Sequence, residues 1–121
     1  MENFSFKNLR VWQKAMHFAE RCLDIAEGVH GHYRLVEQLE AAASSIPQNI
    51  AEGEGRISNK EKINYLYFAR GSLFEAITVL NLFYYKKIIS SSTLDEMEEL
   101  GIEISKMINS LIAQKRKFNS Q

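Results

Sequence analysis

Few residues of this sequence combine the types and the spacing that chemistry requires. Glu27 and His30 have the Glu-x-x-His spacing of di-iron helical bundles, but such a site needs the motif twice, together with carboxylates from two further helices. The motif occurs once here, and the neighbouring Gly28 places it at a helix end. His30 and His32 could hold a surface metal loosely, but a solvated loop is the favoured interpretation. The sequence therefore predicts no metal site and no cofactor.

Neither the paired glycines nor the single cysteine meets the requirements of a reactive site. Gly53 and Gly55 follow no strand and precede no Gly-Lys-Ser or Gly-Lys-Thr, so they do not form a phosphate-binding loop. They are expected to end a helix, where a left-handed residue is favoured. Cys22 falls among apolar helix positions, whereas a reactive thiolate needs a basic, partly open setting. No serine, histidine and acid arrangement suggests a triad. We expect a protein that is not an enzyme and has no small-molecule substrate.

Basic side chains offer a candidate surface for nucleic acid. In an antiparallel four-helix bundle, the start of the first helix and the end of the last lie at the same end, so their charges would meet. The predicted patch consists of Lys7, Arg10, Lys14, Lys115, Arg116 and Lys117. A ring of subunits would repeat the patch and raise the local field. A solvated helix end is the simpler interpretation.

Aromatic side chains could add base stacking to such a surface. The rings concerned are those of Trp12, Tyr65, Tyr67, Tyr84 and Tyr85. Packing in the core or between subunits, with the tyrosine hydroxyl groups at the rim, is the favoured interpretation.

The composition of the 121 residues fits one globular domain with a substantial core. With 15 basic and 15 acidic side chains the formal net charge is zero, so bulk charge gives no support for a strong nucleic-acid-binding field. The single cysteine excludes a disulfide within the chain and fits a reducing compartment. Because there is neither a signal-peptide pattern nor an apolar run of roughly 18 residues, we expect a cytoplasmic protein with no membrane partner.

Apolar residues recur with helical spacing along almost the whole chain, and proline and glycine are scarce. The pattern predicts an all-α domain over residues 1–121, with helices at about 8–27, 33–54, 59–87 and 94–117. Short connections indicate an antiparallel up-and-down four-helix bundle. Pro47 is expected to bend the second helix. Two polar segments, Ser58–Glu61 and Ser90–Thr93, are expected to cap the third and fourth helices.

The first and third predicted helices carry more apolar surface than one chain is expected to cover. The first has an apolar arc of roughly 200°, against about 100° for a helix of a simple bundle. The third is apolar nearly all round. We therefore expect a homo-oligomer. The residues assigned to the subunit interface are Val11, Phe18, Ile25, Phe68, Val79 and Leu82.

Three segments, Phe6–Ala15, Gln38–Arg56 and Ala69–Ala76, carry a family resemblance. By the order and spacing of these segments, the sequence resembles the four-helix-bundle proteins encoded within intervening sequences of bacterial 23S ribosomal RNA genes. The positions that match the family pattern are Trp12, Pro47, Asn49, Glu52, Gly53, Arg56 and Gly71. The resemblance covers nearly the whole chain.

The resemblance implies an up-and-down bundle that assembles into a ring-shaped pentameric barrel. It also implies a relation to the accessory proteins of diversity-generating retroelements, which are basic barrels that bind nucleic acid and a reverse transcriptase. The balanced charge of this chain departs from theirs. We expect a non-enzymatic scaffold or binding module that associates with RNA or with a nucleic-acid-processing partner. The alternative is a protein that binds nucleic acid directly through the basic end of the ring.

Overall fold

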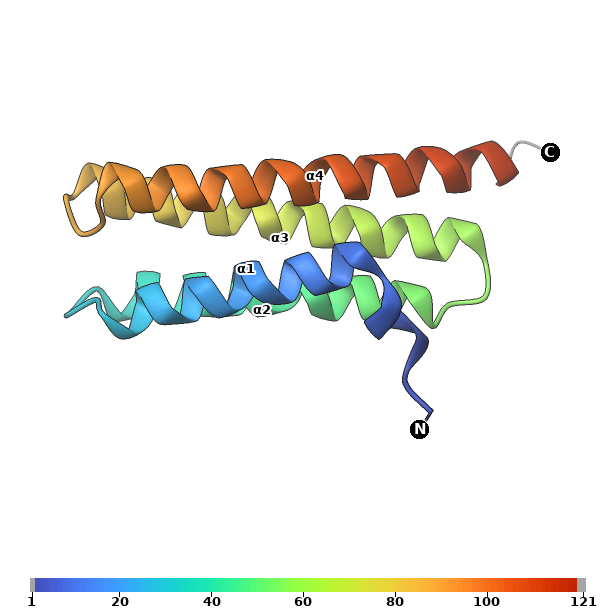
Figure 1. Cartoon of the computed structure of the whole chain (residues 1–121), viewed down its shortest axis with the longest axis horizontal. Helices are drawn as coiled ribbons and strands as arrows, with labels where there is room; N and C mark the ends of the chain where they lie inside the picture. The colour runs from blue at the N-terminus through green and yellow to red at the C-terminus, as the bar shows by residue number, and fades with distance from the viewer. Residues whose placement is uncertain (1, 120–121) are drawn as a thin grey trace.

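Residues 2–119 are described by a computed structural model, and they form four α-helices: α1 (Arg10–Glu27), α2 (Tyr33–Glu54), α3 (Asn59–Tyr85) and α4 (Ser91–Asn119). A short 3₁₀ turn, η1 (Ser5–Asn8), precedes them. Figure 1 shows successive helices running up and down, with α3 and α4 in one layer and α1 and α2 in the other. The described residues include no strand, so the predicted all-α four-helix fold is confirmed.

The helix ends differ from the prediction where local backbone contacts decide them. Leu9 is extended, with φ −75° and ψ 125°, so α1 begins at Arg10 instead of residue 8. Lys87 has a positive φ of 61°, and α3 ends before it. The Ser90 hydroxyl accepts a hydrogen bond from the Thr93 amide at 3.1 Å, which caps α4 and starts it at Ser91. The Ser58 hydroxyl caps α3 in the same way through the Glu61 amide, at 3.2 Å.

The core lies between the two layers and draws on all four helices. Its largest fully buried side chains include Phe18 from α1, Leu39 from α2, Phe83 from α3 and Ile104 from α4. The α2–α3 pair has the most extensive packing of any two helices. Within the described residues, no helix is long and apolar enough to cross a membrane.

The predicted subunit interface is wrong for half of its residues. Val11, Phe18 and Val79 are at most 4% exposed in the single chain, so they have no surface left for a second subunit. The part of the apolar arc of α1 that carries Val11 and Phe18 is covered because α1 packs against both α2 and α4, whereas Met16 on the same arc stays exposed. Ile25 is half-buried against the same core. Phe68 and Leu82 remain exposed on α3.

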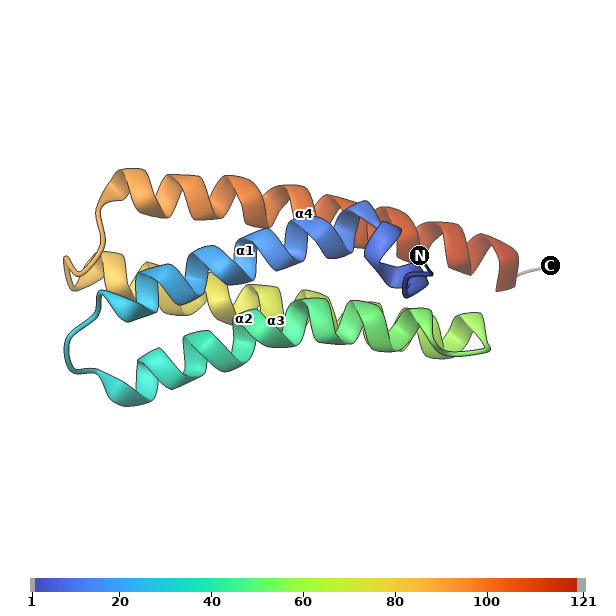
Figure 2. The same cartoon turned by 60° about the horizontal axis from the view of Figure 1, so that its bottom comes forward.

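The segment around Pro47 shapes α2 and its contact with α3. Pro47 is buried inside the helix, and in Figure 2 α2 changes direction near its middle, as an internal proline produces. The Asn49 side-chain amide donates to the Ser45 carbonyl and to the Ser45 hydroxyl, each at 2.8 Å. The Ser45 hydroxyl in turn meets the hydroxyl of Ser72 on α3 at 2.9 Å.

Of the two glycines expected to end α2, Gly55 caps the helix as predicted, whereas Gly53 lies inside it. A Cβ on Gly53 would lie 2.9 Å from the Cβ of Tyr65, so this glycine permits the close approach of α3. Gly55 caps the helix with φ −81° and ψ −4°, which is right-handed. The prediction of a left-handed cap is therefore wrong, because the turn from α2 into α3 contains no residue with a positive φ.

Candidate nucleic-acid interface

The start of α1 and the end of α4 lie at the same end of the bundle, as Figure 1 shows. Within this region the predicted basic residues separate into several groups. Lys14 faces α4 and pairs with Glu103, with 2.8 Å between Nζ and the carboxylate. Its charge is neutralised within the chain, so Lys14 does not belong to an open cationic patch. Lys7 is exposed on η1, and its carbonyl accepts a hydrogen bond from Gln13 at 2.7 Å.

Arg10 lies beside a lysine that the predicted patch omitted. Together with Lys106 it lines a groove of about 390 Å³ between α1 and α4, whose other walls include Leu9, Met107 and Ser110. Among the described residues neither cation has an ion-pair partner. Sequence reasoning missed Lys106 because it lies in the middle of α4, outside the terminal basic run that defined the predicted patch.

Lys115 also gains an unexpected neighbour. It lines a cavity of about 240 Å³ at the end of the bundle, together with Lys62 and Glu54. The Lys62 ammonium donates to the Glu54 carbonyl at 3.4 Å. Lys117 is exposed near the end of α4.

Arg116 turns away from α1 and contacts α3. It donates a hydrogen bond to the Tyr67 hydroxyl, and its guanidinium carbon lies 5.5 Å from the centre of that ring. Arg70, which the predicted patch omitted, lies over the same ring at 4.8 Å and donates to the Asn109 side chain at 2.8 Å. We call Tyr67, Arg70 and Arg116 the open arginine cluster. The six predicted residues therefore do not form one continuous patch.

A second arginine–tyrosine contact lies in the segment that carries the family resemblance. Arg56 donates to the Glu52 carboxylate at 2.6 Å and to the Tyr65 hydroxyl at 2.7 Å, with its guanidinium carbon 4.8 Å from the ring centre. The Glu61 carboxylate lies 3.8 Å away. The hydrogen bond with Glu52 raises the pKa of Arg56. We call Glu52, Arg56, Glu61 and Tyr65 the closed arginine cluster, because carboxylates balance its charge.

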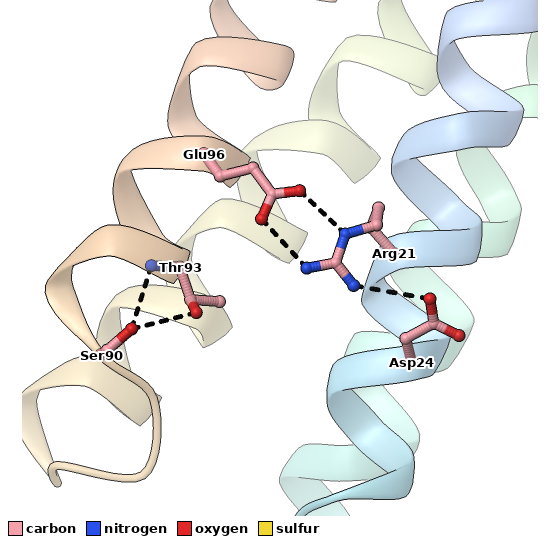
Figure 3. Close-up of polar contacts among 5 residues, drawn as sticks. All are labelled: Arg21, Asp24, Ser90, Thr93 and Glu96. Atoms are coloured by element: carbon pink, nitrogen blue, oxygen red, sulfur yellow. Dashed lines mark hydrogen bonds and ion pairs between the residues drawn. The ribbon is translucent and has the colours of Figure 1, made fainter.

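The acidic first half of α4 is partly neutralised by α1. Figure 3 shows Arg21 between two acids: it donates to both oxygens of Glu96, at 2.8 and 3.0 Å, and to Asp24 at 3.4 Å. The hydrogen bond from Arg21 is the main cause that lowers the pKa of Glu96. The same contact raises the pKa of Arg21. This cross-link holds α1 to α4 near the end opposite the basic groove.

The candidate reactive residues lie in settings that suit packing. Cys22 is fully buried, and burial raises the pKa of its thiol to about 12, so the thiolate is scarce at neutral pH. Within residues 2–119, no three potential metal ligands of the His, Cys, Asp and Glu types converge. Trp12 packs edge-on against Phe6, with 5.2 Å between ring centres.

Two apolar grooves lie on opposite layers of the bundle. The groove between α1 and α2 has a volume of about 510 Å³ and is lined by residues that include Trp12, Met16, Leu23 and Pro47. The groove between α3 and α4 has about 480 Å³ and is lined by residues that include Phe74, Ile77, Gly101 and Ile102. Gly71, one turn before the second groove, is exposed, and a Cβ there would meet nothing within 4 Å.

The fold places this chain in the class of all-α four-helix-bundle proteins. Residues 7–110 match the family of 23S rRNA-intervening sequence proteins, and the chain belongs to this family, as the resemblance indicated. It is similar to the crystal structure of a protein of unknown function from the S23 ribosomal protein family of Bacteroides thetaiotaomicron VPI-5482. The two share 25% identity with a TM-score of 0.78, over 84% of this chain and 97% of the other. The comparison with curated proteins found no match.

Proposed function

We propose that this protein is a non-enzymatic assembly protein whose copies join into a ring. The ring acts as a scaffold or binding module for RNA or for a nucleic-acid-processing partner. The observation that carries the proposal is the presence of two different apolar grooves on opposite layers of one bundle. A contact between unlike surfaces of identical chains repeats from copy to copy and closes into a ring when the rotation permits.

The exposure and height of the two grooves support a contact between them. Met16 is 44% exposed in one, and Phe74 and Ile102 are 57% and 56% exposed in the other. The Lys14–Glu103 pair places the two helices in register. Met16 follows Lys14 by two residues and Ile102 precedes Glu103 by one, so in antiparallel helices both lie at nearly the same level. Neighbouring copies can then bring apolar surface against apolar surface without sliding along the bundle.

Further features of α3 support the same face, and the family resemblance supports the number of copies. Phe68 and Leu82, which the sequence assigned to the interface, are exposed on α3, the helix that forms one wall of the second groove. Gly71 leaves room between Phe68 and Phe74 for a neighbouring chain. The resemblance to barrel-forming relatives supports five copies per ring.

The mass of the protein in solution tests the ring. We expect sedimentation or light scattering to report about five times the 14.0 kDa chain mass at micromolar concentration. Phe74→Glu is expected to lower the mass to that of the monomer, because it introduces a charge into the groove. Ile57→Glu is the matched control, since Ile57 is 98% exposed in a loop outside both grooves. A wild-type protein that stays monomeric would overturn the proposal.

Direct nucleic-acid binding is the second candidate, and one observation favours it. Arg10 and Lys106 line one groove, Lys62 and Lys115 line the cavity next to it, and Arg10, Lys106 and Lys115 have no ion-pair partner among the described residues. Cations of this kind attract phosphates with an affinity that falls steeply with salt.

Paired variants test the second candidate. Arg10→Ala/Lys106→Ala is expected to weaken the binding of a single-stranded RNA. Arg34→Ala/Lys86→Ala, which removes two exposed charges at the opposite end of the bundle, is expected to leave it unchanged. Salt-insensitive binding, or equal effects of the two double variants, would count against the basic end.

A further inference from the structure

We propose that the open arginine cluster is a binding site for the phosphodiester backbone of a nucleic-acid strand. This inference rests on the nucleic-acid-binding candidate above and names a second contact surface for it. The cluster joins two helices: Tyr67 and Arg70 come from α3, and Arg116 comes from α4. Both guanidinium groups lie over the Tyr67 ring, at 4.8 and 5.5 Å from its centre.

Among the described residues, no ion pair balances the charges of this cluster. Each of the five ion pairs in the described part of the chain involves Lys14, Arg21 or Arg56, and none involves Arg70 or Arg116. Two positive charges therefore share one ring, and no carboxylate oxygen of the described residues lies within 4.0 Å of a side-chain nitrogen of either arginine. The negative face of the ring attracts each cation, but it does not cancel their charge. An anion that binds both groups would relieve their mutual repulsion.

The hydrogen-bonding capacity of the two arginines also points to an anion. A guanidinium group has five N–H donors. Among the described residues, Arg70 donates one hydrogen bond, to Asn109, and Arg116 donates one, to the Tyr67 hydroxyl. Arg116 and Asn109 are exposed and Arg70 is half-buried, so the remaining donors can reach a ligand in solvent. Planar forks of N–H groups match the paired oxygens of a phosphate.

The tyrosine positions the arginines and does not itself stack on a base. Because guanidinium groups lie over the Tyr67 ring and its hydroxyl accepts from Arg116, the ring is engaged within the chain. This arrangement favours a ligand that is recognised by its charge. The expected recognition is therefore independent of base sequence, as contacts with phosphates are.

The position of the cluster suits a strand that also contacts the basic end of the bundle. Arg70 and Asn109 lie one helical turn beyond the apolar groove, whose nearest linings are Leu73 and Ser105. Arg116 lies next to Lys115, which lines the end cavity. The proposed subunit contact uses the apolar part of the groove, so the cluster lies at its edge.

Binding of a labelled, mixed-sequence, single-stranded RNA of 20 nucleotides, measured by fluorescence anisotropy across a salt series, tests the inference. Arg70→Ala/Arg116→Ala is expected to weaken binding by about tenfold or more. It should also lower the slope of log K against log salt by about 1.4, because two phosphate contacts are lost. Arg70→Lys/Arg116→Lys should keep most of the slope but bind more weakly, since a lysine lacks the planar fork.

Arg56→Ala is the matched control, because Arg56 lies on a tyrosine in the same way but is balanced by Glu52. It should leave both affinity and slope unchanged. The inference is overturned if Arg70→Ala/Arg116→Ala binds like the wild type, and equally if the wild type binds no strand. If Arg70→Ala/Arg116→Ala binds like the wild type but Arg10→Ala/Lys106→Ala binds more weakly, the basic end remains a nucleic-acid surface and only the open arginine cluster is rejected.

Discussion

Tyr65 and Tyr67 lie two residues apart on α3, and each has an arginine over its ring and on its hydroxyl. Arg56 at Tyr65 is held by Glu52 at 2.6 Å and has Glu61 nearby, whereas Arg70 and Arg116 at Tyr67 have no carboxylate partner in the part of the chain that the structure describes. The same type of arginine–tyrosine contact is thus charge-balanced on the side of α3 that faces α2. On the side that faces α4 it keeps its positive charge. The difference separates a contact that serves the fold from one that is available to a ligand.

The largest expected effect comes from displacing α2 from the closed cluster. Gly53→Ala places a Cβ 2.9 Å from that of Tyr65, and neither backbone can move without disturbing Arg56. We expect a loss of about 1–3 kcal/mol in the free energy of unfolding, as for other overpacked sites. Urea denaturation measures it. Gly55→Ala is the control, because Gly55 is right-handed and its nearest neighbour would be 3.5 Å from the new Cβ. Equal losses in the two variants would show that α3 does not crowd Gly53.

The Arg21–Glu96 cross-link is a second balanced arginine and should also serve stability. Arg21→Ala removes both hydrogen bonds to Glu96 and leaves the acid unpartnered. Because both side chains are partly exposed, we expect a loss of about 1 kcal/mol, the upper end for such pairs. Arg34→Ala, at an exposed arginine that has no ion pair among the described residues, should change the stability by less than about 0.5 kcal/mol. Indistinguishable denaturation curves for these variants would reject a stabilising role for the cross-link.

The same pair predicts a pH dependence. Its hydrogen bonds lower the pKa of Glu96 in the folded chain, so the stabilisation is complete above the ordinary carboxyl pKa of about 4.3. It is lost as the pH falls through the lowered value. We therefore expect the stability difference between the wild type and Glu96→Gln to be largest at neutral pH and to shrink as the pH falls below the ordinary carboxyl pKa. A difference that persists unchanged at pH 3 would exclude the ionised carboxylate as its source.

The sequence predicts features that depend on residues close together in the chain better than features that depend on contacts between helices. Helical spacing located the four helices, because the period depends only on neighbours three and four residues away. The burial of Val11 and Phe18 depends on α2 and α4 both packing beside α1. The apolar arc of a single helix does not show which neighbouring helices will cover it. Arg70 was passed over because it lies within the family segment Ala69–Ala76, and its charge matters only once α4 brings Arg116 to the same tyrosine.

The smallest expected effect distinguishes the two clusters by the sign of their salt dependence. In the closed cluster, salt screens an attraction, so the stability difference between the wild type and Arg56→Ala should shrink as salt is added. In the open cluster, salt screens the repulsion between Arg70 and Arg116. The wild type should therefore gain relative to Arg70→Ala/Arg116→Ala, whose stability should otherwise differ from it by less than about 0.5 kcal/mol. Urea titrations at 0.05 and 0.5 M sodium chloride measure both trends. Shifts of the same sign would mean that an acid balances the open cluster in solution, and such an acid would compete with a phosphate for the two arginines.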